Sequence, residues 1–68
     1  MSVARITEIK ASSTKSFDDA VKTGLTRANQ TLKNIKGAWV KDLEVECGKD
    51  GAIAEYRVLL KVTFVLEE

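Results

Sequence analysis

Hydrophobic and polar residues alternate strictly along the last third of the chain. One set of alternate positions is apolar, namely Tyr56, Val58, Leu60, Val62, Phe64 and Leu66. This two-residue period predicts a β-strand with one apolar face. The other set is Arg57, Leu59, Lys61, Thr63 and Val65, which is polar only in part. We therefore expect one face to cover a core and the other to meet a partner.

A helical period precedes this strand. Apolar or small residues recur three and four apart from Ser16 to Ile35, namely Phe17, Ala20, Val21, Gly24, Leu25, Ala28, Leu32 and Ile35, which predicts an amphipathic helix. Ser16 and Asp19 form a near capping box at its start. Gly37 is a natural residue to follow its end. The glycine inside the stripe, Gly24, predicts close packing of the helix on a sheet.

Two further strands complete the pattern. We expect a first strand over Val3 to Lys10 at an edge, followed by a polar loop from Ala11 to Lys15. The second strand runs from Ala38 to Cys47, and its apolar positions change parity near Lys41-Asp42, which indicates a β-bulge. The segment Gly48-Lys49-Asp50-Gly51 predicts a tight turn into the third strand, which starts at Ile53.

The predicted class is α+β with the order β-α-β-β in one domain, residues 1–68. A helical crossover makes strands one and two parallel, and the turn makes strands two and three antiparallel. Placing strand three in the middle satisfies both conditions. The result is a three-stranded antiparallel sheet of order 1-3-2 wrapped on one helix. A single helix leaves Leu59 and Val65 partly exposed.

Composition favours a self-associating protein. A chain of 68 residues forms a marginal core, and small domains usually need disulfides, a metal or association. Cys47 is the only cysteine and the chain contains no histidine, so an internal disulfide and a zinc site are excluded. Self-association is the remaining way to stabilise so small a core.

The charge pattern and the N-terminus exclude other classes. The 11 basic and 10 acidic residues are balanced, which argues against nucleic-acid binding. No apolar run is long enough to span a membrane. The N-terminal residues Met1 to Arg5 lack the apolar region of a signal peptide, so we expect a cytoplasmic protein.

The residues give little support for catalysis. Histidine, the usual general base, is missing, and we interpret Cys47 as a small apolar filler. The acidic residues Asp42, Glu44, Glu46 and Asp50 lack EF-hand spacing, so we predict a solvated edge and no metal site. Trp39 is open to two interpretations: it packs in a core or interface, or it is a stacking platform for a planar ligand.

The chain resembles the dodecin family over nearly its whole length. The resemblance lies in Ser16-Phe17-Asp18-Asp19-Ala20, Arg27-Ala28, Thr31, the Trp39 region and the strand from Tyr56 to Leu66. It implies a β-α-β-β protein that assembles into a hollow sphere of twelve subunits. It also implies a storage or buffering protein for flavins (riboflavin, FMN or FAD) and no enzyme activity.

The resemblance implies a flavin site on the second and third strands. In flavin-binding dodecins a tryptophan that opens the second strand stacks on the isoalloxazine, and a glutamine after the aromatic residue of the third strand contacts the flavin edge. Here Arg57 follows Tyr56, and an arginine can pair with a flavin carbonyl or phosphate. An ungapped alignment with these dodecins, counted from Thr31, places Gly37 at the position of the stacking tryptophan. If the helix of this chain is two residues longer than theirs, Trp39 takes that position instead.

Two expectations follow from this site. The continuation Val40-Lys41-Asp42-Leu43 matches the family and favours the ungapped alignment. We expect Trp39 and Arg57 to lie near one another on a sheet face at a subunit interface. The alternative ligand is a cation, because the helix-end spacing and the Tyr56-Arg57 pair resemble a calcium-binding dodecin branch; a mainly structural shell is the other possibility.

Overall fold

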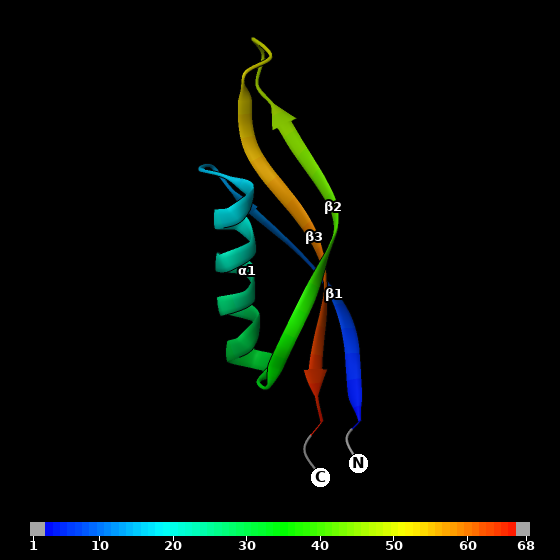
Figure 1. Cartoon of the computed structure of the whole chain (residues 1–68). Coiled ribbons are helices and arrows are strands. Elements are labelled where there is room, and N and C mark those ends of the chain that lie inside the picture. Colours follow the sequence, from blue (N-terminus) through cyan, green and yellow to red (C-terminus); the bar gives the residue numbers. More distant parts are fainter. Residues whose placement is uncertain (1–2, 67–68) are drawn as a thin grey trace.

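The computed structural model describes residues 3–66 as one helix and one sheet (Figure 1). The elements in order are β1 (Ala4–Ser13), α1 (Phe17–Leu32), β2 (Ile35–Cys47) and β3 (Ile53–Val65). The predicted β-α-β-β order is confirmed. Among the described residues, no helix is long and apolar enough to cross a membrane.

The sheet has the predicted strand order, with β3 between β1 and β2. Both outer strands run antiparallel to β3, and Leu60 lies between Ile9 of β1 and Val40 of β2. β1 is longer than predicted, because Ala11 to Ser13 pair with Val58 to Tyr56 instead of forming a loop. The predicted bulge is confirmed as a register shift between Val40 and Asp42.

The start of α1 follows the capping prediction. The Ser16 hydroxyl accepts a hydrogen bond from the Asp19 backbone N–H at 3.0 Å, which satisfies one of the free donors at a helix N-terminus. The Asp19 carboxylate accepts from the Ser13 hydroxyl at 2.6 Å. This bond ties the end of β1 to the first turn of the helix.

The end of α1 differs from the prediction. The helix stops at Leu32, and Lys33 and Asn34 take positive φ values of 59° and 52°. Ile35 then lies in β2 opposite Phe64, so Gly37 is a strand residue and not a helix cap. The periodicity was misleading because Ile35 packs against the same core from a strand.

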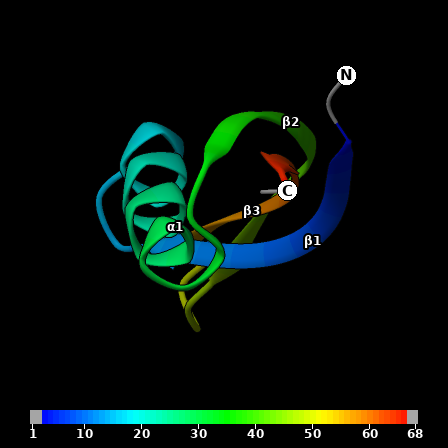
Figure 2. The same ribbon diagram turned by 90° about the horizontal axis from the view of Figure 1, so that it is seen from below.

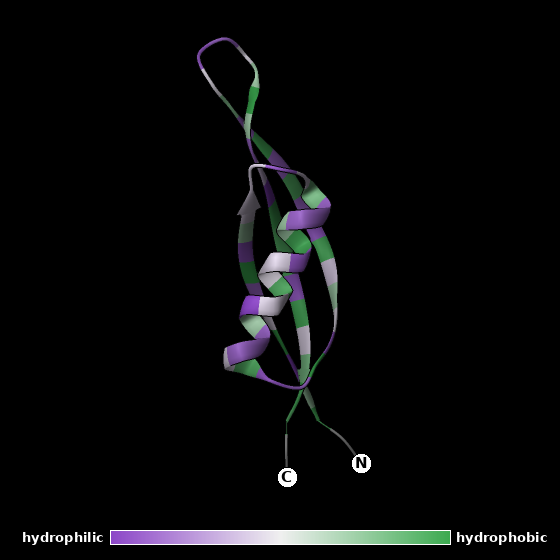
Figure 3. Cartoon of the chain, turned by 90° about the vertical axis from the view of Figure 1, so that its left-hand side faces the viewer, coloured by the Kyte–Doolittle hydropathy of each residue, from purple (hydrophilic) through white to green (hydrophobic). Residues whose placement is uncertain are grey.

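The core lies between α1 and the middle of β3. Four of the described residues are buried, namely Ala20, Val58, Leu60 and Val62. The half-buried Leu25 and Leu32 of α1 pack against them, as the helical stripe predicts. Figure 3 shows α1 covering the middle of the sheet and the β2–β3 turn projecting beyond it.

The helix leaves β2 largely uncovered. It packs on β1 and β3 and hardly touches β2, and the view along the helix shows it over one part of the curved sheet (Figure 2). Val40, Leu43 and Val45 are on the helix side of β2 by their pairing with Leu60, Val58 and Tyr56. All three are nevertheless exposed, and we call them the β2 apolar strip.

Candidate ligand-binding site

The face of the sheet opposite α1, here called the outer face, carries Trp39. In β3 this face consists of the alternate residues from Arg57 to Val65, and cross-strand pairing places Gly37 opposite Thr63 and Trp39 opposite Lys61. Leu59 and Val65 are half-buried, as predicted for a face that the helix does not cover. The other three aromatic residues, Phe17, Tyr56 and Phe64, are not on this face.

Trp39 borders open space. Its exposed fraction is 63%, so the tryptophan is not part of the core of one chain. A Cβ at Gly37 would have no atom within 4 Å. Lys36, Gly37, Ala38, Trp39 and Thr63 together line a shallow hollow of about 330 Å³. A planar ring can therefore lie over Gly37 and touch Trp39 without displacing a side chain.

The two positions considered for stacking lie on the same side of β2. Gly37 and Trp39 are two residues apart, which is about 6.6 Å along a strand. The early end of α1 leaves both of them inside β2. The structure thus places an aromatic surface at Trp39 and an empty space at Gly37, and both belong to one hollow.

Arg57 is held by three glutamates. Its Nε donates to Glu55 Oε1 at 3.1 Å, its second terminal nitrogen pairs with Glu46, and the first lies 3.8 Å from Glu44 Oε1. The hydrogen bond to Glu55 and the charge of Glu46 raise the pKa of Arg57 above its ordinary value. Because the folded-state pKa is raised, any contribution to stability persists through neutral pH and is lost only in strongly alkaline solution.

The expected proximity of Trp39 and Arg57 within the chain is wrong. Trp39 pairs with Lys61 and Glu44 pairs with Arg57, so four residues of β3, about 13 Å, separate the two positions. They do share the outer face. The cause is the antiparallel hairpin, in which the start of β2 must lie beside the end of β3.

The acidic edge and Cys47 lie near the other end of the hairpin. Glu44 also lies 3.5 Å from the Lys10 ammonium, so cations of the chain itself pair with Glu44 and Glu46. Within residues 3–66, no group of three or more His, Cys, Asp or Glu side chains is arranged to hold a metal ion. Cys47 is exposed and not a filler of the core, because the hairpin extends past the helix there (Figure 1).

Sequence reasoning missed three neighbours of Trp39. Lys36 and Thr63 line the hollow, and Lys61 is its cross-strand partner. The turn at Gly48 to Gly51 contained the necessary signal, because counting back from a tight turn along both strands pairs Trp39 with a residue near Lys61.

Comparison with known proteins agrees with this fold. A family model described as Dodecin matches residues 3–67. A curated dodecin of Thermus thermophilus is 34% identical over 61 residues, which cover 90% of this chain and 87% of that protein. The solved structure of dodecin from Streptomyces davaonensis has a TM-score of 0.94 and 36% identity, over 98% of this chain and 97% of that one.

A calcium-binding relative has the same fold. The structure of the calcium dodecin from Mycobacterium tuberculosis, described as having a novel calcium-binding site, has a TM-score of 0.83 and 26% identity. The match covers 96% of this chain and 91% of that one. The family model and the relatives extend over nearly all of the chain, and the chain therefore belongs to the dodecin family.

Proposed function

We propose that this chain forms a homododecameric shell that binds and stores a flavin (FMN, riboflavin or FAD) without catalysing a reaction on it. The observation that carries the proposal is the exposed Trp39 beside the open space at Gly37. An exposed indole next to a shallow hollow suits a flat aromatic ligand, because stacking contributes roughly 1–3 kcal/mol per ring. We place the isoalloxazine over Gly37, in contact with Trp39.

The incompletely buried protomer supports assembly. The described residues include eight exposed large hydrophobic side chains. The chain exposes 5054 Å², whereas a compact monomer of this mass exposes about 4,200 Å². Its radius of gyration is 13.9 Å, against about 11 Å for a compact domain of this length. Contacts between protomers would bury this excess surface.

Flavin fluorescence tests the ligand. We expect quenching when FMN is mixed with the purified protein, and we expect Trp39→Ala to weaken binding by about tenfold to a hundredfold, the equivalent of one stacked ring. Trp39→Phe keeps a ring and should retain part of the affinity. Light scattering checks that each variant keeps the size of the parent assembly.

Arg57→Gln is the matched variant outside the hollow. The glutamates already hold the guanidinium, so we expect unchanged flavin affinity. A loss of affinity would show that Arg57 contributes to the flavin site, the role that the family resemblance gives to its position.

Two results would overturn the flavin proposal. One is unchanged FMN fluorescence at protein concentrations of tens of micromolar. The other is equal quenching by the parent and Trp39→Ala, which would place the flavin elsewhere. If FMN does not bind and calcium raises the melting temperature, the calcium-binding alternative replaces it.

A further inference from the structure

The outer face separates its charges into two groups. Among residues 3–66, Lys36, Lys41 and Lys61 lie around Trp39 with one acidic residue, Glu8. Toward the hairpin turn lie Asp42, Glu44, Glu46 and Glu55 with Lys10 and Arg57. Three lysines against one glutamate give +2, and four carboxylates against two cations give −2. The nearly neutral total charge of the chain conceals this separation.

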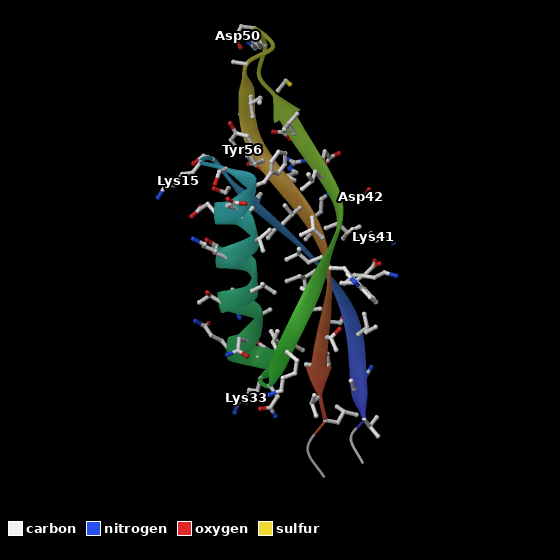
Figure 4. The ribbon with its side chains drawn as sticks, viewed as in Figure 1. Lys15, Lys33, Lys41, Asp42, Asp50 and Tyr56 are labelled. Atoms are coloured by element: carbon white, nitrogen blue, oxygen red, sulfur yellow. The ribbon has the colours of Figure 1, made fainter. Side chains whose placement is uncertain are left out.

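Two of the lysines beside Trp39 have no ion-pair partner in the described part of the chain. The Lys41 ammonium lies 3.0 Å from the Glu8 carboxylate, and the two charges cancel. Figure 4 shows Lys41 on the side of β2 away from the helix. Lys61 is opposite Trp39, and Lys36 lines the hollow. Neither lysine forms an ion pair with any residue in the range 3–66.

We propose that Lys36 and Lys61 make the Trp39 hollow selective for planar ligands that carry an anionic group. The inference rests on the proposed flavin site and adds the chemical class of its preferred ligand, a ring bearing a phosphate. Two ammonium groups beside the ring attract a phosphate through partly screened Coulomb interactions. A neutral ring of the same shape gains nothing from them.

FMN and riboflavin are suitable probes because they share the ring system and differ by one phosphate. We expect FMN to bind the parent protein about five- to tenfold more tightly than riboflavin at low ionic strength, as two partly screened charge pairs allow. The preference should shrink in about 0.5 M salt, where the Debye length falls to a few ångströms. Fluorescence quenching reports both affinities.

Charge-removing variants assign the effect to the two lysines. Lys61→Gln and Lys36→Gln should each weaken FMN binding and leave riboflavin binding unchanged, and the double variant should bind both flavins equally. Lys22→Gln removes an exposed charge on α1 and should change neither affinity. Lys61→Arg keeps the charge and should keep the preference.

The outcomes separate this inference from the flavin proposal. Equal affinity of the parent for FMN and riboflavin overturns the inference but leaves the flavin site intact. Parallel losses of FMN and riboflavin in Lys61→Gln also overturn it, because the lysine would then act through ring contacts. Absence of quenching by both flavins overturns the flavin proposal and the selectivity with it.

Discussion

Gly24 lies in α1 close against β1. A Cβ at this position would stand 2.7 Å from the Cβ of Ala11, a separation too short for two carbon atoms. The position of Gly24 in the apolar stripe correctly predicted that the helix packs closely on the sheet. The partner could not be predicted, because Ala11 was assigned to a loop and only the extension of β1 brings it under the helix.

We predict that Gly24→Ala destabilises the protein. Alanine improves helix propensity by about 1 kcal/mol, but overpacking against β1 should cost about 1–3 kcal/mol. The net loss should appear in denaturant unfolding at fixed chain concentration. Adding Ala11→Gly should restore most of the stability by removing the clashing carbon. A Gly24→Ala protein as stable as the parent would mean that β1 and α1 separate easily.

At the scale of elements, the sequence predicted the sheet better than the end of the helix. Strict alternation identified β3, and its central place followed from the crossover and the turn. The end of α1 was misplaced because Ile35 fits the helical spacing and Lys33 has no residue-type preference for positive φ. For the site, Trp39 and Gly37 were found by type, whereas their distance from Arg57 depended on the hairpin register.

Two leucines on the helix side of the sheet, one buried and one exposed, give a second prediction. Leu60 is fully buried beneath α1, and Leu60→Ala should lower the free energy of unfolding by about 2–5 kcal/mol. Leu43 occupies the same side of the sheet but is 58% exposed, so Leu43→Ala should leave the packing of α1 intact. Near-ultraviolet circular dichroism of Tyr56, whose ring packs edge-on at 5.2 Å from Phe17, reports that packing. A Leu43→Ala spectrum as altered as that of Leu60→Ala would contradict the assignment.

At the scale of the whole molecule, the protomer is long and thin. Its principal extents are 53 × 19 × 14 Å, because β2 and β3 have 13 residues each and α1 has 16. At 3.3 Å per strand residue and 1.5 Å per helix residue, the strands are about 43 Å long and the helix about 24 Å. One helix cannot cover such strands, and self-association follows as the expected remedy.

We predict that charge in the β2 apolar strip disrupts the assembly. Leu43→Asp should reduce the particle size measured by light scattering, because a carboxylate buried between protomers loses its hydration. Lys22→Asp on the exposed surface of α1 is the control and should keep the parent size. A Leu43→Asp particle of full size would show that the strip remains exposed to solvent after assembly.

The uncovered length of the β2–β3 hairpin has a consequence for how the protein responds to its own concentration. A protomer that needs neighbours to cover its strands is stabilised by association. If the proposed shell of twelve chains forms, the assembled fraction rises with a high power of the free-chain concentration, as it does when surfactant molecules form micelles. Below a critical concentration almost no shells would exist, and above it nearly every added chain would enter one. The amount of ligand held would then be set by a threshold in protein synthesis.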